Sequence, residues 1–118
     1  MNSHRVLIAL GSNQRQPVFI QWASQRMAML LHNPRFSPTL WTKDIKGSGR
    51  LDMNRLVAGN TLLSVSEIEQ TLKQIEVEAG RTHDQVTIDL DLMQYDSDRY
   101  HLRDWPRPYI PKLYDQFP

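Results

Sequence analysis

The stretch Thr87-Ile88-Asp89-Leu90-Asp91-Leu92-Met93 alternates polar and apolar side chains. A period of two is typical of a β-strand with one buried face, so its isoleucine and two leucines are expected in the core. Asp89 and Asp91 then share the other face, with Cα atoms roughly 6.5–7 Å apart. Two carboxylates at this spacing can bind one cation or two neighbouring ones, and hard cations such as Mg²⁺ prefer carboxylate oxygens. A solvated edge strand would give the same pattern, although Asp is depleted in strands.

The composition indicates a single folded domain over residues 1–118. Of the 118 residues, 40% are hydrophobic and 23% are charged, as in an ordinary globular protein. A net charge of +1 gives no indication of nucleic-acid or membrane binding. The absence of cysteine excludes disulfides and thiolate metal sites. The apolar run Val6–Leu10 is too short for a signal peptide or a membrane span, so the expected compartment is the cytoplasm.

The first half of the chain predicts three strands and a helix. Arg5 and the continuous apolar run that follows it to Leu10 predict a buried strand that ends at Gly11-Ser12-Asn13. A helix is expected to begin near Pro17 and to stop at Asn33-Pro34. Phe36–Lys43 predicts a second strand, weakened at its start by a proline, and Met53–Leu63 predicts a third, in which a central glycine could mark a bulge or bend.

The second half adds one helix and one strand. Ser64 and Glu67 form a capping-box sequence, which predicts a helix that continues to Ala79 with Gly80 as its C-terminal cap. The aspartate-bearing strand follows. Residues 106–118 are rich in proline and are expected to be extended along a surface or partly disordered. The element order predicts a ferredoxin-like βαββαβ sandwich, an α+β fold whose antiparallel sheet carries both helices on one face. The other face is then available for a ligand.

Three motifs converge on that open face: Gly11-Ser12-Asn13, the segment from Ile75-Glu76 to Gly80-Arg81, and the strand Thr87–Leu92. In this order, from about Arg5 to Tyr95, the chain resembles the 6-hydroxymethyl-7,8-dihydropterin pyrophosphokinase family of folate biosynthesis. The resemblance implies a modified ferredoxin-like fold, in agreement with the predicted elements. It also implies Mg²⁺-dependent transfer of pyrophosphate from ATP to the hydroxymethyl group of the pterin, which leaves AMP.

The resemblance further implies roles for individual residues. Asp89 and Asp91 match the family's ligands for two Mg²⁺ ions, and together with Arg81 they are the expected catalytic residues. Phosphoryl-type transfer depends on positioning and charge neutralisation, which such groups supply. The residues expected to contact ATP are Lys73, Glu76, Arg81 and Lys112. The last of these stands for the histidine in Ile110-Pro111-Lys112, the nearest match to the family's Ile/Val-Pro-His segment. The residues expected to contact the pterin are Thr42, Asn54 and Asp89. Lys43 and Lys46 are further cations at the expected mouth of the site.

The chain also departs from the family pattern. The family's longer basic loop is reduced to residues 82–86, and Val86 stands where the family has an arginine. Its later arginine and phenylalanine-containing strand have no match. These departures leave an alternative open, namely a non-catalytic pterin- or nucleotide-binding relative that has lost the catalytic lid. An RNA-binding module is disfavoured, because Asp89 and Asp91 would repel phosphates without a metal. We expect a monomer or weak dimer with no nucleic-acid or membrane partner.

Overall fold

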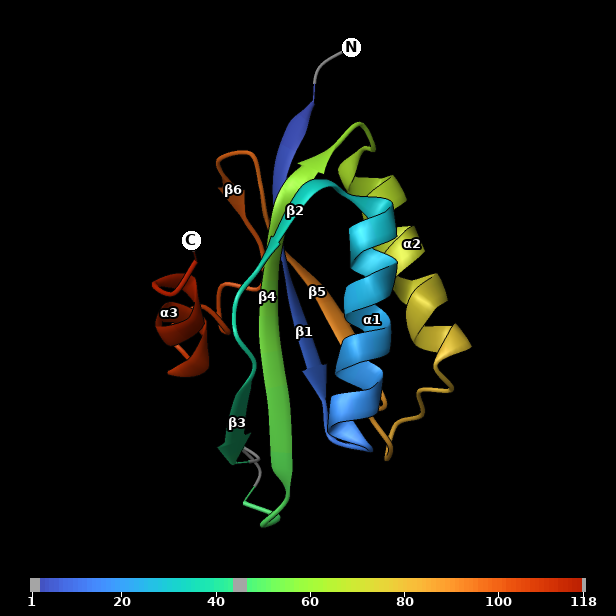
Figure 1. Cartoon of the computed structure of the whole chain (residues 1–118), viewed down its shortest axis with the longest axis vertical. Coiled ribbons are helices and arrows are strands. Elements are labelled where there is room, and N and C mark those ends of the chain that lie inside the picture. The colour runs from blue at the N-terminus through green and yellow to red at the C-terminus, as the bar shows by residue number, and fades with distance from the viewer. Residues whose placement is uncertain (1–2, 44–46, 118) are drawn as a thin grey trace.

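The computed structural model describes residues 3–43 and 47–117, which form one sheet and three helices. Every strand pair in these ranges is antiparallel, in the order β2-β4-β1-β5-β6, with β3 also paired to β4. The predicted α+β, ferredoxin-like sandwich is therefore confirmed. The elements, shown in Figure 1, are β1 (His4–Ser12), α1 (Gln16–Leu30), β2 (His32–Phe36), β3 (Leu40–Lys43), β4 (Leu51–Thr61), α2 (Val65–Glu78), β5 (Asp89–Tyr95), β6 (Asp98–Arg99) and α3 (Tyr109–Tyr114).

Helices α1 and α2 cover one face of the sheet, while α3 lies against the other (Figure 1). The main core fills the space under α1 and α2 and includes Ile88, Leu90 and Leu92, which are at most 5% exposed. The alternation in the aspartate-bearing stretch thus divides its side chains between the two faces as predicted. None of the helices in the described ranges has the length and hydrophobicity needed to cross a bilayer.

Local signals fix the two long helices. Pro17 lies in the first turn of α1, where a missing N–H removes no helical hydrogen bond. At the start of α2 the Ser64 hydroxyl accepts from the Glu67 N–H, and the Glu67 carboxylate accepts from the Ser64 N–H, so the predicted capping box is present. Gly80 follows α2 with a φ of 76°, which favours glycine at a helix end.

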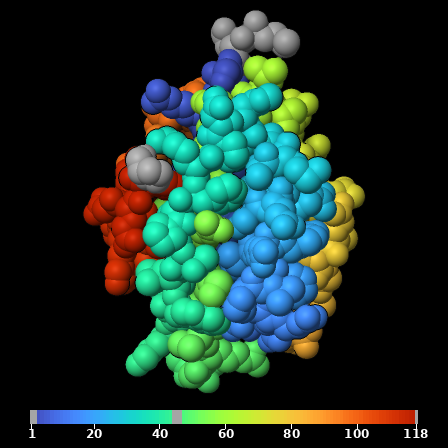
Figure 2. All heavy atoms as spheres, in the orientation of Figure 1, coloured from blue at the N-terminus to red at the C-terminus, as the bar shows by residue number. Residues whose placement is uncertain are grey.

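The predicted second strand is wrong in its bounds, because the structure divides this region into β2 and β3. The interruption falls at residues 37–39, which include Pro38. Buried Ser37 maintains the connection to β4, since its N–H donates to the Leu56 carbonyl and its hydroxyl accepts from the Leu56 N–H. Figure 2 shows the segment that contains β2 and β3 on the surface between α1 and the C-terminal residues.

The glycine in the third predicted strand, Gly59, lies between Ala58 and Asn60, the two β4 residues that flank a register shift against β2. Strand β4 runs unbroken through Gly59, and the register shift lies in β2, between His32 and Arg35. A Cβ atom on Gly59 would lie 3.0 Å from the Leu31 Cβ and 3.1 Å from the His32 carbonyl oxygen. The glycine therefore permits a close approach between β4 and the chain that leaves α1.

The prediction of an extended or partly disordered tail is also wrong, because residues 109–114 form α3. Ile110 and Leu113 are each 1% exposed and pack against Leu7, Leu56 and Met93 on the sheet face opposite α1 and α2. This second cluster covers part of the face that was expected to be open. Pro118, the last residue of the predicted tail, lies outside the described residues.

The docking of α3 predicts that Ile110→Ala destabilises the protein by about 2–5 kcal/mol, since the substitution leaves a cavity in the second cluster. Lys112→Ala is the matched control, because Lys112 is exposed on the same helix and should change stability by less than ~0.5 kcal/mol. Urea unfolding measures both values. Equal free energies of unfolding for the two variants would contradict the docking.

Candidate functional site

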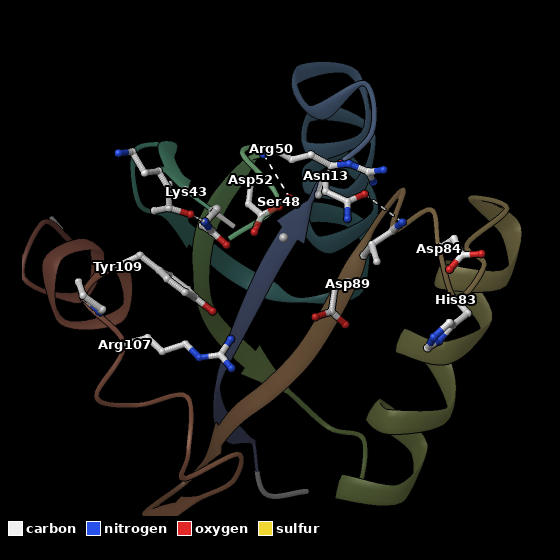
Figure 3. A pocket seen from close by; sticks show the side chains of 16 residues that line it. Asn13, Lys43, Ser48, Arg50, Asp52, His83, Asp84, Asp89, Arg107 and Tyr109 are labelled. Carbon is white, nitrogen blue, oxygen red and sulfur yellow. Dashed lines mark hydrogen bonds between the residues drawn. The ribbon is translucent and has the colours of Figure 1, made fainter. Parts of the chain in front are cut away.

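A cavity of about 850 Å³ lies on the α3 side of the sheet, where β1 ends and β5 begins (Figure 3). Its lining comes from segments far apart in the sequence, which the antiparallel pairing of β1 with β4 and β5 brings together. The lining residues are Gly11, Ser12, Asn13, Thr42, Lys43, Ser48, Arg50, Asp52, Asn54, His83, Asp84, Val86, Asp89, Arg107, Pro108 and Tyr109.

Asp89 and Asp91 lie on the cavity side of β5, opposite Gly11 and Ala9 of β1. Asp89 lines the cavity, and Asp91 is the next residue on the same face, with a side chain 28% exposed. Burial raises the pKa of Asp91 to about 7, and the negative charge of Asp89 adds to the shift. When no cation is bound, the Asp91 carboxyl therefore keeps its proton up to a pH near 7.

Arg81 supplies positive charge directly beside this pair. Its Nη1 donates to Asp89 Oδ1 and to Glu76 Oε2, both at 2.8 Å. The Arg81 side chain is 33% exposed, so the ion pairs are partly shielded from water. The predicted catalytic residues Arg81, Asp89 and Asp91 are thus brought together, although Arg81 and Asp91 are not among the described residues that line the cavity.

Glu76 joins the end of α2 to the start of β5. The same Oε2 that accepts from Arg81 also accepts from the Leu90 N–H at 2.8 Å. Burial raises the pKa of Glu76, while the Leu90 N–H and Arg81 oppose that shift. Glu76 therefore positions both Arg81 and the strand that carries the aspartates.

The turn after β1 holds the short loop that precedes β5. The Asn13 N–H donates to the Val86 carbonyl at 2.9 Å, and the Asn13 side-chain oxygen accepts from the Val86 N–H at 3.0 Å. Val86, at the position of the family's arginine, consequently faces the cavity with an apolar side chain. His83 and Asp84 of the same loop also line the cavity (Figure 3).

Thr42 and Asn54 lie together on the wall formed by β3 and β4. Asn54 is 6% exposed, and its Nδ2 donates to the Thr42 hydroxyl at 2.7 Å. Gly11 lies beside this amide, and a Cβ there would be in van der Waals contact with Asn54 Oδ1 at 3.4 Å. The three residues expected to contact the pterin, Thr42, Asn54 and Asp89, all line one cavity.

Two other predicted residues lie elsewhere. Lys73 on α2 and Lys112 on α3 are exposed and are not among the described residues that line the cavity. Their assignment to ATP stays a prediction. Lys43 lines the cavity as expected, whereas Lys46 lies outside the described residues.

Sequence reasoning missed the part of the site that comes from the tail. Arg107, Pro108 and Tyr109 line the cavity, and they immediately precede the Ile110-Pro111-Lys112 segment that was matched to the family. The sequence signal was Arg107 between Pro106 and Pro108, but our sequence analysis treated these residues only as part of a proline-rich stretch. Arg50 and Asp52, at the start of β4, were also missed.

The donor chemistry around β5 fits a hard divalent cation. Asp89 and Asp91 offer carboxylate oxygens on one face, and the ligand atoms of Asp91, His101 and Asp104 lie within 4.8 Å of one another. Asp104 and His101 come from the loop that follows β6. The pKa of Asp91 is raised first by its burial and then by the negative charge of Asp89.

Together, the fold and the cavity define a ferredoxin-like α+β protein with one cavity lined by carboxylate, amide and cationic side chains. A family model described as 7,8-dihydro-6-hydroxymethylpterin-pyrophosphokinase (HPPK) matches residues 7–114. The match covers nearly the whole chain, so the chain belongs to the HPPK family, whose activity is the transfer of pyrophosphate in folate biosynthesis. A comparison with curated proteins finds no match.

The raised pKa of Asp91 predicts a pH-dependent stability of the metal-free protein. In the unfolded chain this carboxyl loses its proton near pH 4, but in the folded protein only near pH 7. The stabilisation it contributes is therefore complete below pH 4 and is lost as the pH rises through 7, an effect on the order of a few kcal/mol. Urea unfolding of the parent and of Asp91→Asn between pH 4 and 8 measures it. Parallel pH profiles for the two proteins would contradict the shift.

Proposed function

We propose that this chain transfers pyrophosphate from ATP to the hydroxymethyl group of 6-hydroxymethyl-7,8-dihydropterin with the help of Mg²⁺. The observation that carries the proposal is the pair of carboxylates on β5, one of which, Asp89, accepts a hydrogen bond from Arg81. Asp89 lines the same cavity as the hydrogen-bonded pair Thr42 and Asn54. The cavity volume of about 850 Å³ lies within the range of small-molecule sites. Family membership supplies the class of reaction.

In this proposal Asp89 and Asp91 hold two Mg²⁺ ions. When bound, the ions neutralise phosphate charge and help to align the reacting groups. A cation at Asp89 also competes with Arg81 for that carboxylate. The two Arg81 bonds described above both use Nη1, and a guanidinium has five donors, so further donors remain for phosphate oxygens.

The pterin is assigned to the wall formed by Thr42 and Asn54. One Asn54 donor bonds to Thr42, which fixes the orientation of the amide and leaves its oxygen and second N–H for a ligand. A pterin edge carries both donors and acceptors and can match this amide. Asp89, on the facing strand, adds an acceptor in the same cavity. Contacts of Lys73, Glu76 and Lys112 with ATP remain part of the proposal without support from the cavity lining.

A binding protein without catalysis is the second candidate. It is favoured by one observation, the apolar Val86 that the Asn13 bonds hold at the cavity in place of a cation. Loss of a donor from an electrostatic site can reduce a rate by ~10²–10³. Both candidate functions predict binding of ATP–Mg²⁺ and the pterin, and only the enzyme also releases AMP.

The direct test is AMP release from ATP, Mg²⁺ and the pterin. We expect turnover by the parent and a loss of at least ~10²-fold in Asp89→Ala and Asp91→Ala, together with loss of Mg²⁺-dependent ATP binding. Asp98→Ala is the control, because Asp98 is exposed on β6 and does not line the cavity. ATP binding without AMP release in the parent would favour the binding protein. An aspartate variant that binds ATP–Mg²⁺ as tightly as the parent would remove that residue from the metal site.

The pterin assignment predicts that Asn54→Ala weakens pterin binding by about 1–3 kcal/mol, because polar groups of the ligand are left unpaired. Titration calorimetry with the pterin alone measures the change, and circular dichroism checks the fold of the variant. Asn60→Ala is a suitable control, since Asn60 lies on the same strand outside this cavity. Identical pterin affinity in Asn54→Ala and the parent would place the pterin elsewhere.

A further inference from the structure

A second cavity, of about 910 Å³, lies at the end of the sheet where β1 begins. Helix α3 lies between the two cavities, because Tyr109 at its start lines the first one, whereas Tyr114 and Phe117 at its other end line the second. In Figure 1, α3 accordingly lies beside the middle of the sheet, between the end marked N and the end that carries β3. None of the described residues that line one cavity lines the other.

We propose that this second cavity binds a small organic anion with a planar ring, that is, an aromatic carboxylate or an aryl phosphate. Its volume lies within the range of small-molecule sites. Because the residues involved are not those assigned to ATP, Mg²⁺ or the pterin, this second site is independent of the proposed pyrophosphate transfer.

Two irregularities of the sheet border the second cavity. In β2 two residues, Asn33 and Pro34, lie opposite the single Gly59 of β4. In β5 Met93 is an extra residue opposite β1, and the shift places the next residue, Gln94, at the cavity. Such bulges redirect side chains and are frequent beside functional sites. Asn33 and Pro34 also line the cavity, so both irregularities turn residues towards the same space.

The charges around this cavity favour an anion. Arg5 of β1 and Arg35 of β2 both line it, from the two strands that flank β4. Asp96 is the one acidic residue among the described lining residues. Its carboxylate accepts from the Arg5 N–H at 3.0 Å and lies 2.7 Å from His4 Nδ1. Guanidinium groups therefore outnumber carboxylates here, and a guanidinium can bind two oxygens of a carboxylate or phosphate at once.

Amide side chains add neutral hydrogen-bonding groups to the same wall. Asn60 of β4 is half-buried and lies opposite Arg5 in the sheet. The Gln94 Nε2 donates to the Asp96 carbonyl at 2.9 Å, which orients the amide and leaves its second N–H for a ligand. Both amides line the cavity and can contact a polar substituent of the ligand.

Aromatic rings at the end of α3 supply the apolar part of the cavity. The Tyr114 and Phe117 rings pack edge to face with centroids 6.1 Å apart, and Trp105 packs on Tyr114 in the same manner at 6.2 Å. These neighbours hold the Tyr114 ring although it is 44% exposed. A ring fixed in this way offers a surface to another flat ring. The cavity thus combines aromatic and guanidinium groups, which suits a ligand that carries both a ring and a negative charge.

The test is a titration of ¹⁵N-labelled protein followed by the NMR shifts of its amides. Benzoate and phenyl phosphate are the anionic probes, and benzamidine is a cationic probe with the same ring. We expect saturable shifts at Ala58, Asn60 and Gln94 with an anionic probe, and the tighter of the two shows whether the site prefers a carboxylate or a phosphate. Benzamidine should give no saturable shift at these positions, because the two arginines repel it.

Variants then test the two arginines. Arg5→Ala and Arg35→Ala should each weaken binding of the tighter anionic probe by about 10-fold, and Arg5→Lys should give an intermediate affinity, since lysine keeps the charge but not the planar fork. Arg103→Ala is the matched control, because Arg103 is exposed and is not among the described residues that line either cavity. It should bind the probe as the parent does.

ATP–Mg²⁺ binding, measured by calorimetry on the same preparations, separates this site from the first cavity. Parent affinity for ATP–Mg²⁺ in Arg5→Ala and Arg35→Ala would support two independent sites, whereas its loss would show that the arginines act through the fold and would overturn the proposal. Three other results would also overturn it: no saturable shift at the second cavity with either anion, equal shifts with benzamidine, and equal probe affinity in the parent, Arg5→Ala and Arg35→Ala.

Discussion

Two carboxylates on one face of one strand repel each other, and the rest of the site offsets that repulsion. Arg81 bonds to Asp89, and Glu76 holds both Arg81 and the backbone of Leu90. The helix-end motif and the aspartate motif are therefore one structural unit, because the first supplies the charge and the anchor that the second requires. Burial, together with the negative charge of Asp89, still raises the pKa of Asp91 to about 7. In the function that we propose, a metal–polyphosphate complex would bring positive charge to these carboxylates.

Sequence reasoning succeeded where local and long-range signals agreed. The alternation around Asp89 and Asp91 sets the buried face of β5, and the Ser64–Glu67 capping box starts α2 through contacts between close neighbours. The juxtaposition of Asn54 and Thr42 with Asp89 followed from the predicted fold and the resemblance together, since an antiparallel sheet places facing positions of β1, β4 and β5 side by side. None of these predictions required knowledge of the C-terminal segment.

The remaining features depend on tertiary contacts that leave little trace in the sequence. Helix α3 has only six residues, and its stability comes from Ile110 and Leu113 packed on the sheet rather than from helix propensity. Its prolines suggested an extended chain, although one in the first turn removes no helical hydrogen bond. The second strand is split at the segment that contains Pro38, and the bond from the Leu56 N–H to the Ser37 hydroxyl, which keeps this segment beside β4, has no local pattern that predicts it. Arg107 was missed for the same reason, because its place at the cavity depends on the docking of α3.

The central claim is that the carboxylates of β5 bind metal together with a nucleotide. The measurement that tests it most directly is a crystal structure of the protein with Mn²⁺ and a non-hydrolysable ATP analogue, in which anomalous scattering locates the metal independently of the protein atoms. The account predicts anomalous peaks within coordination distance of the Asp89 and Asp91 carboxylates, with the phosphates of the analogue in the cavity. An ordered nucleotide in this cavity with no metal peak at either carboxylate would contradict it.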